Sequence, residues 1–402
     1  MAQTVISWRT LFLRVIKLIC NELRCMFTDE GLILVFVLSI IFYSGFYLLP
    51  FSHNILREVP VGIVDLDHSP MSRQLTRALD ASEMLKVTNT ADSFAQANAQ
   101  YLRNETRAFI EIPKNFEKNL KRGMKVVIPV YEDNSYMIVY KQVATGISSV
   151  LGSFGAGTEI RSLMKKGLSY EEASALRLPV NNVENALFNP SGSYEVYLYP
   201  LILIMILQQT LLIGITMLGG TAREYRTPMI TNFGVGCIYL TFFRAVAHVL
   251  VYTVYGMIFL YALPQIAVYH VHVHFFINLL ILVIFLFAVS FLGQSLVILF
   301  TQRETSFLLF IASSVPMIFL TGFVWPTESI PDIMVIISKF LPVVVASDAL
   351  LKLNQMGASV SSVTENVIWL LIQCVIYYMA AVKVNRKLKN EEKLNSSVVQ
   401  LR

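Results

Sequence analysis

The chain has 402 residues, of which 55% are hydrophobic and only 15% charged, and its mean hydropathy is +0.59. This composition excludes an ordinary soluble globular domain and favours a membrane protein. The formal net charge is +5, but residues 51–195 carry equal numbers of basic and acidic side chains. This polar stretch therefore offers no basic surface suited to nucleic acid.

Six apolar runs are long enough to cross a hydrocarbon core of about 30 Å, which takes about 20 helical residues. They lie near residues 31–50, 196–219, 237–263, 275–300, 306–325 and 365–384. The polar stretch 51–195 separates the first run from the other five, which all lie within residues 196–384. The sequence therefore predicts a polytopic α-helical membrane protein with six membrane helices and an inserted α/β extracytoplasmic domain at 51–195.

Basic residues set the predicted orientation. They are frequent in residues 1–30 and 385–402, and they follow the second and fourth spans, whereas the loop after the third span has none. The positive-inside rule places both termini in the cytoplasm and residues 51–195 outside, in a bacterial inner membrane. A cleavable signal peptide is disfavoured because the first run is too long and no small-residue cleavage site follows Leu49.

Apolar residues at helical spacing within residues 1–30 predict a cytoplasmic amphipathic helix that lies in the membrane interface. The alternative is a basic flank that only orients the first span. Residues 385–402 are expected to form a cytoplasmic tail.

The stretch 51–195 alternates short β-rich runs with helical patterns, as in an α/β domain with a small sheet. Strands are expected at 59–64, 85–88, 107–112 and 125–131, and helices at 69–79, 91–101, 115–120 and 136–164. Three glycines, Gly152, Gly155 and Gly157, are expected to loosen the last helix. All four cysteines lie outside this domain, so no disulfide framework is indicated.

Two clusters raise the question of a metal site. Asp65, Asp67, Ser69 and Ser72 follow the first strand and suit a cation, but a turn and a helix N-cap explain them better. Histidines at 270, 272 and 274 would share one face of an extended segment, yet no carboxylate or cysteine stands beside them to complete a site. A wetted loop is the preferred interpretation, and no metal is expected.

No catalytic or nucleotide-binding pattern is present in the sequence: neither a P-loop nor a Rossmann glycine fingerprint, and no metalloprotease or serine-hydrolase motif. No series of acidic residues runs through the spans, which argues against a self-sufficient ion-coupled transporter. Polar residues within the spans are candidates for lining a pathway, although amides often only join helices. These candidates are Gln208, Gln209, His248 and Gln294.

Two further segments carry candidate roles. Residues 220–234 form a short polar element between the second and third spans, placed to contact a cytoplasmic partner. Residues 326–350 are apolar but interrupted by prolines, which predicts a re-entrant or interfacial segment on the outer side.

Several short motifs, in this order, resemble those of type-2 ABC exporter permeases, in the branch with a large periplasmic domain between the first two spans. They are Val61-Gly-Ile-Val-Asp-Leu-Asp-His-Ser69 with Ser72-Arg-Gln-Leu75, Ile112-Pro-Lys-Asn-Phe116, Tyr131-Glu-Asp-Asn-Ser135, Thr321-Gly-Phe-Val-Trp-Pro326 with Ile330-Pro331, and Leu341-Pro342. The resemblance extends from about Val59 to Val382.

The resemblance implies that residues 220–234 are a coupling helix that contacts a separate ATPase. The family pattern R-E-x-E-x-G-T is only partly kept here, since its first Arg-Glu and its glycine are missing. The coupling residues implied are Arg223, Glu224, Tyr225, Arg226 and Thr227. An outer gate is implied at Phe323, Trp325, Pro326 and Pro331.

The function that the resemblance implies is that of a permease subunit, not an enzyme, which exports an amphiphilic or lipid-like small molecule, drugs included. Its partners would be an ABC ATPase in trans, which binds ATP and Mg, a second permease chain, identical or related, and a periplasmic adaptor in some systems. The competing interpretation is an orphan membrane scaffold or receptor of similar topology without an ATPase. The polar segment around Arg223 favours the exporter, because a scaffold has no need for it.

Overall fold

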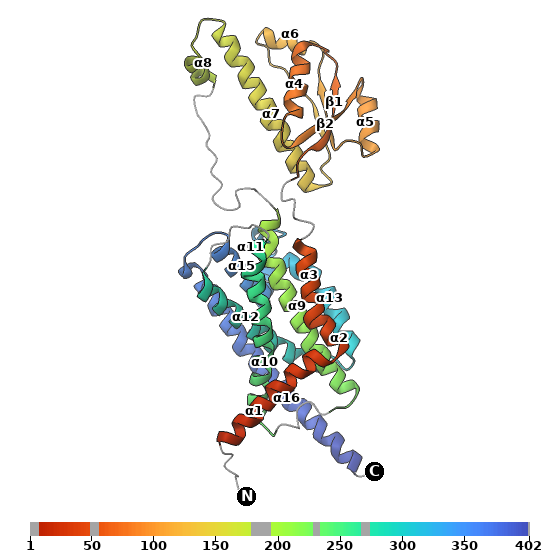
Figure 1. The fold of residues 1–402 in the computed structure, drawn as a ribbon, viewed down its shortest axis with the longest axis vertical. Coiled ribbons are helices and arrows are strands. Elements are labelled where there is room, and N and C mark those ends of the chain that lie inside the picture. Colours follow the sequence, from red (N-terminus) through yellow and green to blue (C-terminus); the bar gives the residue numbers. More distant parts are fainter. Residues whose placement is uncertain (1–7, 49–55, 178–193, 228–233, 267–273, 401–402) are drawn as a thin grey trace. The chain divides into compact units, whose positions relative to one another are not determined.

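The structure, a computed structural model, describes residues 8–48, 56–177, 194–227, 234–266 and 274–400 (Figure 1). The chain divides into two compact units. The helical unit comprises Met1–Ser52 and Ala186–Arg402, and the α/β unit comprises His53–Asn185. The polar stretch recognised in the sequence therefore forms a unit of its own, with limits that lie inside the predicted range 51–195.

A four-stranded sheet forms the centre of the α/β unit. Its strands are β1 (Val59–Asp65), β2 (Leu85–Ala91), β3 (Ala108–Ile112) and β4 (Val130–Glu132). They lie in the order β2-β1-β3-β4, with β1 parallel to both β2 and β3 and with β4 antiparallel to β3. Each parallel connection runs through a helix, as the alternation of patterns in the sequence predicts.

Helices cover both faces of this sheet. Helices α4 (Pro70–Asp80) and α7 (Met137–Met164) lie on one face and α5 (Phe94–Leu102) lies on the other, whereas α6 (Phe116–Lys121) packs beside α4 and α8 (Tyr170–Arg177) packs against α7. Val61 and Ile63 of β1 pack with α4 and α7, whereas Val64 packs with α5, because neighbouring strand residues face opposite sides. Helix α7 is continuous over 28 residues, so its three glycines do not interrupt it.

The acidic and hydroxyl cluster after β1 forms a turn and two helix caps. Ser69 Oγ accepts the backbone N–H of Ser72 at 3.1 Å, and Ser72 Oγ donates to Asp65 at 2.6 Å. The Asp67 carboxylate accepts the first two backbone N–H groups of α6, at 3.0 and 3.1 Å. Among the described residues, no group of three His, Cys, Asp or Glu side chains is placed to hold a metal ion.

The helical unit begins with a sharply bent pair of helices. Helix α1 (Trp8–Thr28) is followed by α2 (Glu30–Ile33), the π-helical turn η1 (Leu34–Leu38) and α3 (Ser39–Leu48). The chain bends by 85° at the break after Thr28. Asp29 is the N-cap of α2, the first helix after the bend, because its side chain accepts hydrogen bonds from the backbone N–H groups of Gly31 and Leu32.

The second part of the helical unit holds the longer apolar helices. These are α9 (Tyr194–Glu224), α10 (Cys237–Met257) continued by η3 (Ile258–Ala262) and α11 (Leu263–Ile266), α12 (Phe275–Leu296) with η4 (Val297–Leu299), α13 (Arg303–Leu320) and α16 (Thr364–Gln400). Between α13 and α16 lie η5 (Thr327–Ser329), α14 (Asp332–Ser338), α15 (Pro342–Asn354) and η6 (Val360–Val363). Helices α14 and α15 meet at 87°, which agrees with a broken or re-entrant segment.

By length and composition, five helices in the described residues are long and apolar enough to cross a membrane, or up to seven if each bent pair counts as one span. The pair that contains α2, η1 and α3 corresponds to the first predicted span. The chain is thus a multi-pass membrane protein with a small mixed α/β insertion.

Helix α9 is the centre of the helical unit. In its most apolar stretch 83% of the residues are buried, against 11% in α13. Close packing depends on Gly214, since a Cβ atom there would lie 2.0 Å from the buried ring of Phe36 in η1. Helix α9 therefore touches the first span closely, whereas α13 leaves most of its surface uncovered.

Candidate functional site

Three helix ends are tied together by Asp29, Arg223, Glu224 and Arg303, which we call the helix-end junction. At the end of α9, Arg223 Nη1 donates to the carbonyl oxygens of Ile298 and Phe300, at 2.8 and 2.9 Å. Glu224 Oε2 accepts the backbone N–H of Arg303, the first residue of α13, at 3.3 Å. The carboxylate thereby meets the positive end of the α13 dipole.

The side chain of Arg303, whose backbone N–H binds Glu224, reaches the start of the first span. Arg303 Nη1 donates to Asp29 Oδ2 at 3.0 Å, and Arg303 Nη2 donates to the other carboxylate oxygen. Such a bidentate pair fixes direction as well as distance. Asp29 caps α2, so the junction connects the end of α9, the beginning of α13 and the bend before α2.

The structure separates the five predicted coupling residues into two groups. The side chains of Arg223, which is half-buried, and of Glu224, which is exposed, make contacts of the junction, and the three residues that follow, Tyr225, Arg226 and Thr227, are exposed. Helix α9 runs on to Glu224, and Arg226 adopts a left-handed backbone with φ of +51°. Residues 228–233 of the predicted segment 220–234 lie outside the described residues, so the contact with an ATPase stays a prediction.

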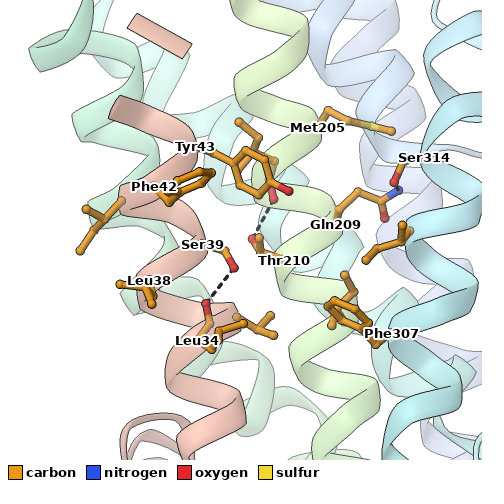
Figure 2. A pocket seen from close by; sticks show the side chains of 15 residues that line it. Leu34, Leu38, Ser39, Phe42, Tyr43, Met205, Gln209, Thr210, Phe307 and Ser314 are labelled. Carbon is orange, nitrogen blue, oxygen red and sulfur yellow. Dashed lines mark hydrogen bonds between the residues drawn. The ribbon is translucent and has the colours of Figure 1, made fainter. Parts of the chain in front are cut away.

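A cavity of about 650 Å³ lies between η1, α3, α9 and α13 (Figure 2). Because η1 and α3 are consecutive parts of one helix, the walls come from three helices in all, and the helix-end junction joins the ends of these three. The residues that line it are Leu34, Val35, Leu38, Ser39, Ile41, Phe42, Tyr43, Met205, Ile206, Gln209, Thr210, Ile213, Phe307, Ile311 and Ser314. The cavity is therefore mainly apolar, with a few polar groups, as binding sites for small molecules usually are.

Of the four predicted pathway residues, the structure places Gln209 in the cavity wall. Its Nε2 donates to Ser314 Oγ at 2.8 Å and to the Phe310 carbonyl at 3.2 Å, so it links α9 to α13. The adjacent Gln208 is fully buried elsewhere, and its Oε1 accepts the backbone N–H of Val343 at 2.8 Å. Gln208 thus caps the beginning of α15.

The other two pathway candidates, His248 and Gln294, are buried between helices away from this cavity. Gln294 Nε2 donates to the Thr241 carbonyl at 3.2 Å, which joins α12 to α10. His248 Nδ1 lies 3.0 Å from Ser290 Oγ, and its Nε2 lies 3.3 Å from Glu22 Oε1. Both therefore hold helices together in this structure, and a place on the pathway stays a prediction.

Sequence reasoning missed Glu22, which forms a buried charge cluster with Arg244 and His248. Arg244 Nε and Nη2 lie 2.9 and 2.8 Å from Glu22 Oε1, and all three side chains are more than 90% buried. The cluster attaches α1 to α10. A signal was available, because Glu22 lies one helical turn from both Leu18 and Met26 and so falls on the apolar face of α1.

Asp29, Arg303, Phe307 and Ser314 were missed for a different reason. Each looks ordinary in the sequence, and its role depends on a partner far along the chain. Asp29 between two helical patterns is a possible N-cap, which indicates a helix start but not its partner.

The predicted outer gate residues lie after α13. Phe323 is buried, and its carbonyl accepts the Tyr197 hydroxyl of α9 at 3.1 Å. Trp325 and Pro326 are exposed, and Pro331 immediately precedes α14. Phe323 therefore anchors this segment to α9, and gating stays a prediction.

These features define a polytopic helical membrane protein with an α/β insertion, a pocket between helices and no recognisable catalytic centre in its sequence. Residues 30–383 match the ABC-2 family transporter proteins, and the chain belongs to this family. Members are transmembrane permease subunits without catalytic activity, and they pair with a separate ABC ATPase subunit. A search of curated proteins found no significant match.

Proposed function

We propose that this permease subunit exports an amphiphilic or lipid-like small molecule, drugs included, and that the cavity between η1, α3, α9 and α13 binds it on the way. The observation that supports this most directly is the cavity itself. Its walls come from three helices that also meet at the helix-end junction, so a displacement at the junction would alter the cavity.

Two permease chains, identical or related, would form the transport pathway. Helix α13 supports this arrangement, because only 11% of its most apolar stretch is buried within one chain. Its large exposed side chains include Leu308, Ile311 and Val315, and Phe42 and Phe46 of α3 are similarly exposed. A second chain placed against α3 and α13 would cover this apolar surface and close the cavity.

ATP hydrolysis would act on this chain through its inner face. With both termini in the cytoplasm, Tyr225, Arg226 and Thr227 face the ATPase. When the ATPase changes conformation on ATP hydrolysis, Arg223 and Glu224 would transmit the displacement of the end of α9 to α13. The α/β unit then lies in the periplasm, where an adaptor protein could continue the path. The segment from Phe323 to Pro331 would open and close the exit.

The experiment that tests this function is gentle purification of the intact protein from its native membrane, with quantitative mass spectrometry of everything that accompanies it. We expect an ABC ATPase near one copy per permease chain. An intact permease oligomer that carries no ATPase would contradict the proposal and favour the alternative, an orphan scaffold or receptor.

A matched pair of variants tests the position of the contact. Tyr225→Ala removes a side chain that is 68% exposed beside the junction, and we expect much less ATPase to copurify. Tyr170→Ala removes a side chain that is 63% exposed in the α/β unit and should leave the ATPase in place. Equal loss or equal retention in both variants would rule out this contact site.

A further inference from the structure

The beginning of α15 depends on a side chain from another helix. Pro342, the first residue of α15, has no backbone N–H, and the preceding Leu341 has no side chain that could cap the helix. The backbone N–H of Val343 instead donates to Gln208 Oε1 of α9 at 2.8 Å. Both residues are fully buried, so loss of this hydrogen bond would leave a buried N–H and a buried oxygen without a partner.

The Gln208 amide also contacts α13. Its Nε2 lies 3.6 Å from Met317 Sδ, and a flipped amide would turn its NH2 group toward the Val343 N–H, so the surroundings determine the orientation. Gln209 Nε2 lies 3.7 Å from the same sulfur, and Figure 2 shows this nitrogen turned toward Ser314. Because Gln209 and Ser314 line the cavity, a short chain of contacts leads from the cavity wall through Met317 to the start of α15.

Helix α13 lacks one of its own hydrogen bonds at this level. Pro316 lies inside the helix, next to Met317, and has no backbone N–H. Sharp bends of helices are usually found at such positions. Gln209 contacts α13 before the proline, at Ser314, whereas Gln208 contacts it after the proline, at Met317. A bend of α13 at Pro316 would therefore change the contact between Gln208 and α13.

Two further amides hold α15, and they come from helices that do not line the cavity. Asn366 Nδ2 of α16 donates to the Val345 carbonyl at 3.0 Å. Asn278 Nδ2 of α12 donates to Asn354 Oδ1 at 2.6 Å, at the end of α15. The described lining of the cavity includes residues of α9 but none of α12 or α16. Gln208 thus differs from the other two amides, because it joins α15 to two helices of the cavity wall.

From these contacts we infer that Gln208 is the positioning residue through which the re-entrant helix α15 responds to movement of the cavity wall. While α13 rests against α9, the Gln208 amide is held in place and caps α15. When α13 moves, the contact that fixes the amide is lost, the hydrogen bond to Val343 breaks and the first turn of α15 loosens. This inference rests on the proposed function, because it connects the same cavity to the segment 326–350.

The test measures hydrogen exchange of α15 in the full-length permease bound to its ATPase in lipid nanodiscs. The complex is compared without nucleotide and after trapping of the ATPase with ATP, Mg²⁺ and orthovanadate. We expect the backbone N–H groups of the first turn, from Val343 to Ala346, to exchange about tenfold faster in the trapped complex. This factor corresponds to the loss of one hydrogen bond that contributes about 1.4 kcal/mol.

A matched pair of variants separates positioning from simple support. Gln208→Met keeps the length of the side chain but removes Oε1, so the first turn should exchange fast in both states and the ratio between the states should fall to about one. Asn278→Leu removes a similarly buried amide at the other end of α15, so the tenfold ratio for the first turn should remain. The comparison of the two states in the wild type does not depend on any variant.

Unchanged or slower exchange of the first turn in the trapped wild-type complex would overturn the inference, as would a tenfold ratio that persists in Gln208→Met. Loss of the ratio in both variants would overturn it too, since Gln208 would then only support α15 as Asn278 does. Copurification of the ATPase is measured separately in the same preparations. A complex that hydrolyses ATP without any response of α15 leaves the proposed function standing, whereas absence of an ATPase contradicts both.

Discussion

The α/β unit and the helical unit use charged residues differently. In the described part of the α/β unit, each ion pair includes at least one exposed side chain, and in the pair of Arg57 with Glu83 the two side chains are 62% and 70% exposed. In the helical unit, Glu22 and Arg244 are 8% and 3% exposed and lie 222 positions apart in the chain. Exposed pairs contribute roughly 0 to 1 kcal/mol, whereas removal of one partner from a buried pair costs roughly 3 to 5 kcal/mol.

The difference follows from the surroundings of each unit. The α/β unit is held by the apolar core on its sheet, so its charges mainly keep the surface solvated. In the helical unit the apolar surfaces resemble one another from helix to helix, and lipid competes for them. A few buried or half-buried charges therefore determine which helices meet, at Glu22 with Arg244 and at Asp29 with Arg303.

The largest expected effect comes from Glu22→Gln. This change leaves the Arg244 guanidinium buried without its countercharge, so we expect α1 to detach from α10 at a cost of about 3 to 5 kcal/mol. Hydrogen exchange of the α1 backbone should become much faster. The matched control Glu83→Gln breaks the exposed pair with Arg57 in the α/β unit, and the free energy of hydrogen exchange in that unit should change by about 1 kcal/mol or less. Unchanged exchange in α1 would show that the cluster does not hold this helix.

An intermediate effect is expected at the helix-end junction. Asp29→Asn and Arg303→Gln each break a bidentate pair that is about three-quarters buried, and charged hydrogen bonds contribute about 1.5 to 3 kcal/mol. In the complex with its ATPase, each variant should lower the substrate exported per ATP hydrolysed several-fold.

The double variant, Asp29→Asn with Arg303→Gln, should be little worse than either single variant, because both changes remove the same interaction. Additive losses in this cycle would mean that the two residues act separately and that the junction is not a unit.

The smallest effect is expected at Asp67 in the α/β unit. Burial alone would raise the pKa of this carboxyl, but hydrogen bonds from Ser69 and from the N–H groups at the start of α6 outweigh burial and lower the pKa. A lowered pKa stabilises the folded unit above the ordinary pKa of an aspartate, and this contribution is lost as the pH falls through the lowered value.

Asp67→Asn should therefore cost about 1 kcal/mol at pH 7, and the difference from wild type should shrink in acid. Hydrogen exchange of the α6 backbone, compared between variant and wild type, measures the cost at pH 7 and, when repeated under acid conditions, shows how far the difference shrinks. Asp92→Asn, at an exposed position, is the control and should have little effect. A difference that stays constant down to strong acid would contradict the role of the Asp67 carboxylate.

Local features of the α/β unit were predictable because their causes lie close together in the sequence. Ser69 followed by Pro70 signals a helix start, and α4 begins there with the expected hydrogen bond to Ser72. The alternation of strand and helix patterns likewise gives the order of strands and helices along the chain, whereas the order of strands in the sheet, β2-β1-β3-β4, came from the structure. β4 is shorter than predicted, Val130–Glu132 instead of 125–131, since only this part pairs with β3.

The candidate site was predictable only in part. Residues 220–234 stand out as a polar segment between apolar spans, but the sequence does not show that Glu224 meets the start of α13. The cavity is lined by three stretches that lie up to about 280 residues apart, from Leu34 to Ser314. Such contacts depend on how helices pack, which no local pattern encodes.

Gln208 and Gln209 show most clearly which features the sequence determines and which depend on helix packing. The sequence alone determined that both lie in an apolar span, where an amide side chain needs a polar partner. Neighbouring residues of a helix point about 100° apart, so the two amides face different helices. The tertiary structure decided that Gln208 caps α15 and that Gln209 reaches α13 at the cavity, because only the packing of helices determines which partner each amide meets.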